Sequence, residues 1–211
     1  GGSVANFQRG FDRINVPSVL TTLVTDELDF PNLSMVGVDD RAAAYTAVDY
    51  LIRQGHRKIA VLGGPVTSYP SLMRRQGAQQ AMEDAGIVFN DKLYGLSNYD
   101  FESAYHAMNS LLARRAEFTA LFAMSDVIAF GAIRALVSAG FRVPEDVSVI
   151  GFDGITMSRY CVPVMTTIVQ PSEQIALQSI ELLVRQIEHG SPAQTVTLQP
   201  ELQQGESVRA I

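Results

Sequence analysis

The sequence predicts an α/β protein built from doubly wound parallel sheets. Short apolar runs of strand length recur along the chain and alternate with longer segments whose apolar residues have helical spacing. Residues 119–154 show the unit in full: an apolar run at 119–123, a helical segment over 127–139 and a second buried run at 147–151. A strand, a helix and a strand within about 30 residues are typical of a right-handed parallel crossover.

The remaining elements follow the same alternation in chain order. Asp39-Asp40, Ser125-Asp126 and Ser172 can cap helix starts, and glycines at 55, 86, 140 and 190 can end helices. The expected strands cover residues 17–22, 34–38, 58–62, 93–96, 119–123, 147–151, 166–169, 195–199 and 202–208. The expected helices cover residues 4–14, 39–54, 72–85, 101–115, 127–139 and 172–189.

Composition restricts the kind of protein. The chain has 211 residues, of which 47% are hydrophobic, which is ample for a buried core. The net charge of −6 argues against direct binding of nucleic acid by this chain. No apolar run is long enough to cross a membrane, and the start at Gly1 is not a signal peptide, so no membrane partner is expected. A single cysteine suits a reducing cytoplasm, and a start without methionine suggests a fragment of a longer protein or a processed product.

Enzyme motifs are missing from the sequence. The glycine cluster Gly63-Gly64-Pro65 follows a strand but does not continue as GxGxxG, and there is no P-loop or GxSxG elbow. Three histidines lie far apart, and Cys161 has no histidine partner and is read as a packed residue. We therefore expect no catalytic residue, no cofactor and no metal site.

Five polar residues follow predicted strands at the edge where parallel sheets bind ligands: Ser68, Arg74, Tyr99, Ser125 and Asp153. An arginine fork, a carboxylate and an aromatic face together suit a neutral, polyhydroxylated or heterocyclic small molecule. Taken one at a time, each also has a structural interpretation, such as a solvated helix charge, a packed ring, a helix cap or a turn residue. Asp126 is interpreted as structural.

Several segments make this chain resemble the effector-binding domain of the lactose-repressor family of bacterial transcription regulators. The match runs nearly end to end from Val16, and it includes VPSVL, VGVDD, LIRQGHRKIAVLGGP, RRQG, SDVIAFGAIRAL, GFRVPEDVSVIGFDG and MTTIVQP. Periplasmic sugar-binding proteins share the fold but usually lack GHRKI and VPEDVSVIGFD.

The resemblance implies a periplasmic-binding-protein-like sensor of type I, with two subdomains, a ligand cleft between them and three crossover strands. Residues 1–38 and 168–190 would form part of the N-terminal subdomain, which would be incomplete. Residues 39–166 and 195–211 would form the C-terminal subdomain. Family members begin with a helix-turn-helix headpiece that reads operator DNA as a dimer, so operator DNA would be reached only through a headpiece that is absent here.

The resemblance also carries site residues. Arg74 occupies the position of the family's pocket arginine, which precedes a glycine in the same helix (Gly77 here). Asp153 occupies the position of the aspartate that follows the strand ending in GF. The other carried positions are Ser68 after the GGP turn, Tyr99 before the next helix, Ser125 where many members have asparagine, and Thr22 where some sugar-responsive members have an acid. For the homodimer interface we expect the 127–139 helix, with Phe130 as its anchor, and the 160–162 segment, with Tyr160 and Cys161.

Two functions from different classes remain open. The first is a cytoplasmic effector sensor of a repressor, and the second is an extracytoplasmic sugar-binding protein that serves a transporter or chemoreceptor. The loop containing Ser68 and Pro70 offers one short hydroxyl, which favours a sugar-like effector, with a nucleoside as the nearest competitor.

Overall fold

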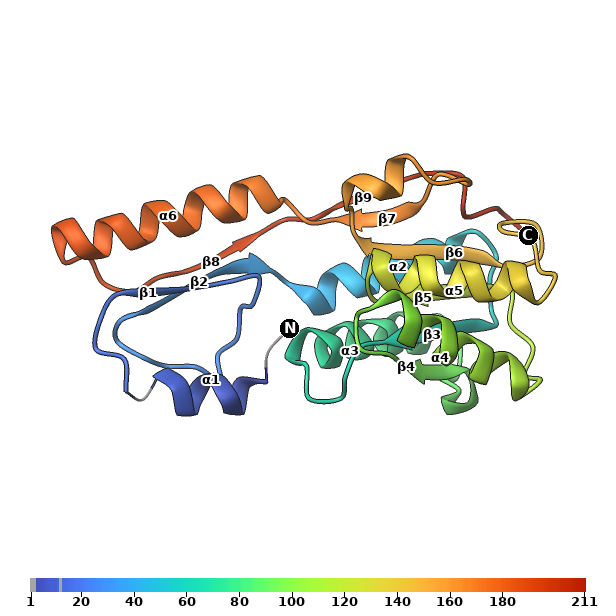
Figure 1. The fold of residues 1–211 in the computed structure, drawn as a ribbon, viewed down its shortest axis with the longest axis horizontal. Helices are drawn as coiled ribbons and strands as arrows, with labels where there is room; N and C mark the ends of the chain where they lie inside the picture. Colours follow the sequence, from blue (N-terminus) through green and yellow to red (C-terminus); the bar gives the residue numbers. More distant parts are fainter. Residues whose placement is uncertain (1–2, 12) are drawn as a thin grey trace.

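The computed structural model describes residues 3–11 and 13–211, and it has the expected α/β class (Figure 1). Two separate sheets lie at the two ends of an elongated molecule, and helices flank each of them (Figure 1). All strand pairs described within the sheets are parallel except the pair β7–β9.

The larger sheet has six strands in the order β4-β3-β5-β6-β7-β9. Strand β3 lies between β4 and β5, so the direction of winding reverses at β3, which is the mark of a doubly wound sheet. The strands are β3 (Ile59–Gly63), β4 (Tyr94–Leu96), β5 (Ala120–Ala123), β6 (Ser148–Asp153), β7 (Thr166–Val169) and β9 (Glu201–Gln203).

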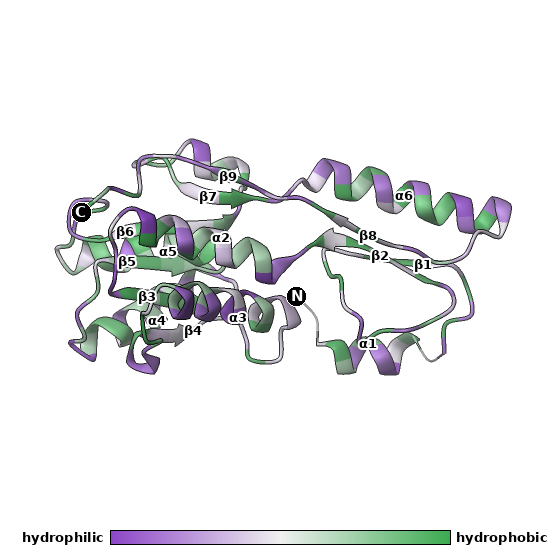
Figure 2. Ribbon diagram, turned by 180° about the vertical axis from the view of Figure 1, so that it is seen from behind, coloured by the Kyte–Doolittle hydropathy of each residue, from purple (hydrophilic) through white to green (hydrophobic). Residues whose placement is uncertain are grey.

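Two pairs of helices cover the two faces of this sheet. Helices α2 (Asp40–Arg53) and α3 (Tyr69–Asp84) share one core with Ile59 and Val61 of β3, whereas α4 (Phe101–Ala113) and α5 (Asp126–Ser138) share the other core with Ala60 and Leu62. Successive strand side chains therefore point to opposite, equally buried faces, which explains why these strands are continuous apolar runs. Figure 2 shows them as predominantly hydrophobic ribbons between the helices.

The smaller sheet consists of β1 (Ser18–Thr21), β2 (Leu33–Val38) and β8 (Thr195–Leu198), in that order. Along β2, Val36 and Val38 face helix α6 (Ser172–His189), and Leu33 and Met35 pack in the cluster that includes Val4 of α1 (Val4–Phe11). Figure 1 shows α6 and α1 on opposite sides of this sheet.

The chain passes between the two sheets three times: from β2 to α2, from β7 to α6 and from β8 to β9. This corrects the expected subdomain boundaries at two places. Thr195–Leu198 pairs with β2 and belongs to the smaller sheet, and Ile168 and Val169 belong to β7 of the larger sheet. The alternating pattern of residues 195–199 correctly predicted a strand, but it carries no information about which sheet that strand joins.

Candidate ligand-binding site

A pocket of about 200 Å³ lies at the carboxyl edge of the larger sheet, where the two sheets face each other. Both sheets supply its walls, because Thr22 follows β1 of the smaller sheet and Asp153 ends β6 of the larger one. The lining residues are Thr22, Pro70, Arg74, Tyr99, Asp153 and Gln170. Four of these, Thr22, Arg74, Tyr99 and Asp153, are residues that the sequence singled out.

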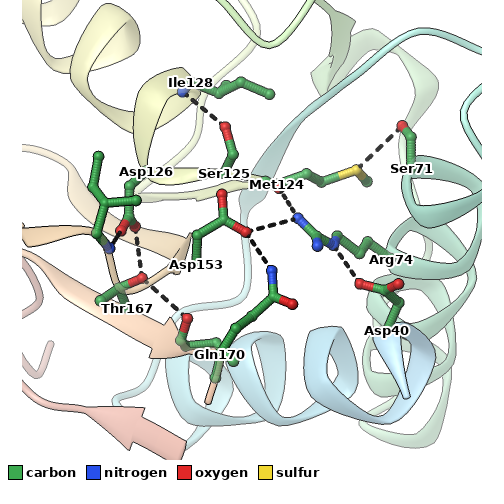
Figure 3. Close-up of polar contacts among 12 residues, drawn as sticks. Asp40, Ser71, Arg74, Met124, Ser125, Asp126, Ile128, Asp153, Thr167 and Gln170 are labelled. Atoms are coloured by element: carbon green, nitrogen blue, oxygen red, sulfur yellow. Dashed lines mark hydrogen bonds and ion pairs between the residues drawn. The ribbon is translucent and has the colours of Figure 1, made fainter. Parts of the chain in front are cut away.

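Arg74 is the centre of the polar network (Figure 3). It projects from α3, is 6% exposed, and stacks its guanidinium 3.6 Å from the centroid of the Phe152 ring. Its Nε donates to Asp40 Oδ1 at 2.7 Å, and its Nη1 donates to the Met124 carbonyl and lies 3.5 Å from Asp153 Oδ1. Because an arginine cannot lose its proton in a protein, these oxygens hold a permanent buried cation in one position.

Asp153 faces the pocket from the end of β6. Its Oδ1 accepts a 2.7 Å hydrogen bond from Gln170 Nε2 in addition to its contact with Arg74. Burial raises the pKa of the Asp153 carboxyl, and the neighbouring Arg74 partly counters that rise. Burial likewise raises the pKa of Asp40, again countered in part by Arg74. The two carboxylates and the cation thus form one coupled group.

The backbone around the pocket is strained. Among the described residues, four that are not glycine have a positive φ, and three of these line the pocket: Thr22 (63°), Tyr99 (59°) and Asp153 (113°). Such conformations cost of the order of 1–3 kcal/mol each and concentrate at functional sites. The strain therefore supports this pocket as the site independently of its side-chain chemistry.

Tyr99 lies against the backbone of Gly64, with no room for a side chain at that position: a Cβ there would overlap the Tyr99 ring. The Tyr99 hydroxyl is buried and has no hydrogen-bond partner. The glycine cluster that fails as a dinucleotide motif thus has another role here, because Gly64 lets the aromatic ring approach the pocket wall.

A second network lies behind Asp153. Asp126, which is completely buried, accepts a 2.6 Å hydrogen bond from Thr167 Oγ1 and a 2.8 Å hydrogen bond from the Ile155 N–H (Figure 3). Burial raises the pKa of Asp126 to about 6, although these two hydrogen bonds oppose the rise. Asp126 therefore links the loop that follows β6 to strand β7 through hydrogen bonds, in agreement with its structural interpretation.

Ser68 and Ser125 lie at the same edge but do not line the pocket. Ser68 caps α3 by accepting from the Ser71 N–H at 3.4 Å, and Ser125 caps α5 by accepting from the Ile128 N–H at 3.1 Å. Figure 3 shows the Ser125 hydroxyl directed at that helix start. Both hydroxyl oxygens thus accept a hydrogen bond from a helix N–H, as the helix-cap interpretation has it.

Three residues of the site are not among the ligand-binding residues expected from the sequence. Gln170 immediately follows β7 and Pro70 stands in the first turn of α3, so position after a strand could have indicated both. Asp40 lies two residues after β2 and had the same signal. It was expected to open a helix, and its pairing with Arg74 joins residues 34 positions apart.

The residues expected at a dimer interface lie away from the pocket. Tyr160 is 81% exposed, whereas Phe130 is half-buried against the α4–α5 core with its ring 6.4 Å from that of Phe101. Cys161 is also half-buried, and its Sγ lies 3.3 Å from the Ser158 carbonyl oxygen.

A larger hollow of about 370 Å³ opens at the opposite end of the larger sheet, beside Lys58 and Glu117. These two exposed side chains pair with each other at 2.5 Å, and no network of buried polar groups converges there. Within the described part of the chain, no group of acidic, histidine or cysteine side chains could hold a metal ion. No described helix has the length and apolar character needed to span a bilayer.

Comparisons with known proteins agree with this architecture. Residues 48–208 match the family described as "Periplasmic binding protein-like domain". Among solved structures, a sugar-binding transcriptional regulator of the LacI family from Escherichia coli, complexed with phosphate, is 31% identical with a TM-score of 0.82; the match covers 99% of this chain and 74% of that one. The chain belongs to the LacI family.

Two transcriptional regulators extend the match. The transcriptional regulator MalR of Clostridium butyricum is 36% identical over 209 residues, covering 98% of this chain and 62% of MalR. The regulator CelR, solved as its cellobiose complex, is 29% identical with a TM-score of 0.82, covering 97% of this chain and 68% of CelR. The chain thus spans less than two thirds of the length of the curated relatives that it matches.

Proposed function

We propose that this chain is the sensor of a bacterial transcription regulator, in which a small sugar-like effector binds between the two sheets and alters operator binding. Contact with DNA would be made by a helix-turn-helix headpiece outside this chain. The observation that carries the proposal is a pocket whose walls come from both sheets and from one of the crossings between them. A ligand in such a pocket favours one relative position of the two sheets, which is how binding energy becomes a conformational signal.

The chemistry of the lining supports a hydroxylated ligand. The Asp153 carboxylate can accept from a pair of hydroxyls, Gln170 can donate and accept, and the Tyr99 ring can cover an apolar ring face. The volume of about 200 Å³ is below the range of roughly 300–1,000 Å³ usual for drug-sized ligands, which favours a small ligand.

The names of relatives support a sugar as the preferred candidate for the effector. MalR and CelR are transcription regulators, and CelR was solved with cellobiose bound. A nucleoside remains the nearest competitor, since its ribose could use the same carboxylate and its base could stack on Tyr99. The phosphate in the Escherichia coli relative makes inorganic phosphate a further probe.

We further infer that the protein is not an enzyme, works in the cytoplasm and forms a homodimer through the α5 face and the Tyr160 segment. Exposed apolar residues at Met157, Tyr160 and Val162 support that surface as the interface. An extracytoplasmic binding protein is the less favoured reading, because the relatives are named as transcription regulators.

A thermal-shift screen of sugars and nucleosides on the purified chain tests the proposal. A ligand present at a hundred times its Kd stabilises the folded state by about 2.7 kcal/mol, so a true effector raises the melting temperature by several degrees. The Asp153→Asn variant, screened in parallel, should show a smaller shift at the same ligand concentration. If no compound stabilises the protein, or if a sugar is chemically converted, the proposal is wrong.

A further inference from the structure

The single cation of the pocket is already compensated by acidic groups. Of the described residues that line the pocket, Arg74 alone carries a positive charge. Its guanidinium lies 2.7 Å from the Asp40 carboxylate and 3.5 Å from the Asp153 carboxylate. The Arg74–Asp40–Asp153 cluster has a net charge of −1 when both carboxyls are ionised and of zero when one is protonated. It is positive only when both carboxyls are protonated.

Two of the three guanidinium nitrogens of Arg74 are already engaged. Its Nε is bonded to Asp40, its Nη1 is bonded to the Met124 carbonyl and lies near Asp153, and its planar face is stacked on Phe152. The side chain is 7% exposed, so little beyond Nη2 is left for an incoming ligand. A phosphate group normally binds two nitrogens of an arginine at once, and here Nε and Nη1 already bond to oxygens of the protein.

Helix N-termini are the other common anion sites, and each of those at this edge has a side-chain cap, an acidic first turn or both. The helices α2, α3, α4 and α5 each have a side chain that caps the first turn: Asp39, Ser68, Asp100 and Ser125. The helix α6, which begins just after Gln170, has no side-chain cap, but α2, α4, α5 and α6 each carry an acidic residue in the first turn: Asp40, Glu102, Asp126 and Glu173. The free N–H groups and positive dipole ends that would attract a phosphate are thus satisfied or opposed by carboxylates.

We propose that this pocket selects unphosphorylated ligands: it accepts neutral sugars or nucleosides and rejects their phosphate esters. The inference rests on the proposed function and deepens it by assigning the charge of the effector. Selection comes from repulsion, because a phosphate dianion brought beside the acidic cluster finds no uncompensated cation. Such juxtaposed like charges are an effective means of excluding a wrong partner.

Calorimetry on the wild-type protein tests the charge selection with pairs that consist of a neutral compound and its phosphate ester. The pairs are glucose with glucose 6-phosphate and adenosine with adenosine monophosphate, extended to the sugar or nucleoside that gives the largest thermal shift and its phosphate ester. Inorganic phosphate is titrated alone as a probe of bare anion binding. We expect the neutral member of the binding pair to bind at least about tenfold more tightly than the ester, and no heat from phosphate.

The Asp40→Asn variant identifies the cause. It removes one negative charge but keeps a side-chain oxygen that can accept from Arg74 Nε, so the preference for the neutral member should shrink by about tenfold. Asp39→Asn is the matched control, because it makes the same charge change one residue away, retains a good helix cap and leaves the Arg74 contacts in place. Selectivity of the control should stay at the wild-type value.

The outcomes separate the two levels of inference. An ester that binds as tightly as its neutral partner, or more tightly, overturns the charge selection but leaves the sensor function standing. Binding of neither member of any pair, including those from the wider screen, removes the sensor function and the selection with it. If Asp40→Asn does not fold, the wild-type comparison of the pairs still decides the question.

Discussion

At the scale of single residues, the carboxylate of Asp153 is the group on which ligand affinity should depend most. Replacing it with asparagine removes one hydroxyl acceptor at the pocket and leaves Gln170 and Arg74 in place. Asparagine tolerates the positive φ of 113° better than most residues, so the backbone should be preserved. We expect Asp153→Asn to cost about 1–3 kcal/mol of binding free energy, or roughly 5- to 150-fold in Kd.

Calorimetry with the best ligand from the screen measures that loss. Asp146→Asn is a suitable control, because Asp146 is a distant, exposed partner of Arg142. An unchanged Kd in the Asp153 variant would show that the ligand does not use this carboxylate.

Gly64 offers a second test at this scale. A methyl group at position 64 would occupy the space of the Tyr99 ring, so Gly64→Ala must push the ring out of the pocket wall. We expect about 1–3 kcal/mol of destabilisation from overpacking and a loss of ligand affinity of at least several-fold. Gly10→Ala, where a Cβ meets nothing, is the control. Denaturant unfolding and calorimetry on both variants measure the two effects; wild-type affinity in Gly64→Ala would exclude Tyr99 from binding.

Sequence reasoning at the residue scale could predict which residues lie at the carboxyl edge of the larger sheet, because the place of a residue relative to the strands determines this. Asp153 ends β6, Tyr99 closely follows β4, and Arg74 lies in α3, the helix after β3; parallel topology brings the three to one edge. It could not distinguish a side chain that faces the pocket from one that caps a helix, because Ser68 and Ser125 occupy equivalent places after strands. The Asp40–Arg74 pair depends on the packing of α2 against α3, which no local pattern encodes.

At the scale of the elements, the buried Asp126 carboxyl connects α5, β7 and the loop after β6, and its ionisation should affect stability. The pKa is raised from 3.8 to about 6, so the folded protein holds this proton more tightly than the unfolded chain does. This contribution is fully present below pH about 4, and it is lost as the pH rises through about 6. The difference of about two pKa units corresponds to roughly 3 kcal/mol across the whole window.

Urea unfolding at pH 5 and pH 7.5 checks this linkage. Relative to Asp126→Asn, the wild-type protein should lose about 1 kcal/mol of unfolding free energy between the two pH values. The loss of the hydrogen bonds from Thr167 and Ile155 shifts the variant by the same amount at both pH values, so it does not obscure the slope. Parallel pH profiles for the two proteins would contradict the raised pKa.

The elements themselves were mostly predictable, and their pairing was less so. The 166–169 strand and the 172–189 helix were expected with the bounds that the structure has, because caps and apolar spacing are local signals. The strand expected at 202–208 ends at Gln203, and β8 joined the smaller sheet against expectation. Both strands lie in the last stretch of the chain, where pairing depends on partners more than 30 residues away.

At the scale of the whole molecule, the proposed dimer can be tested without disturbing the core. Tyr160 is 81% exposed, so Tyr160→Asp should leave the fold intact while placing a charge in the proposed interface, and we expect a monomer. Val88→Asp is the matched control, since Val88 is 88% exposed on another surface. Sedimentation velocity on the three proteins measures the outcome. A dimer that survives the Tyr160 change would place the interface elsewhere.

Phe130→Asp complements this test, because Phe130 is half-buried and packs against the α4–α5 core. A folded monomer would assign the ring to the interface, whereas an unfolded chain would assign it to the core.

The three passages of the chain between the sheets restrict how the molecule can move. The third passage runs from β8, which pairs with β2, to β9, which pairs with β7, and only Gln199 and Pro200 separate the two strands. Twisting or sliding one sheet past the other would stretch at least one of the three connections, whereas bending about an axis that crosses all of them would not. A change in the relative position of the two sheets should therefore occur mainly as hinge bending, which a single angle between them describes.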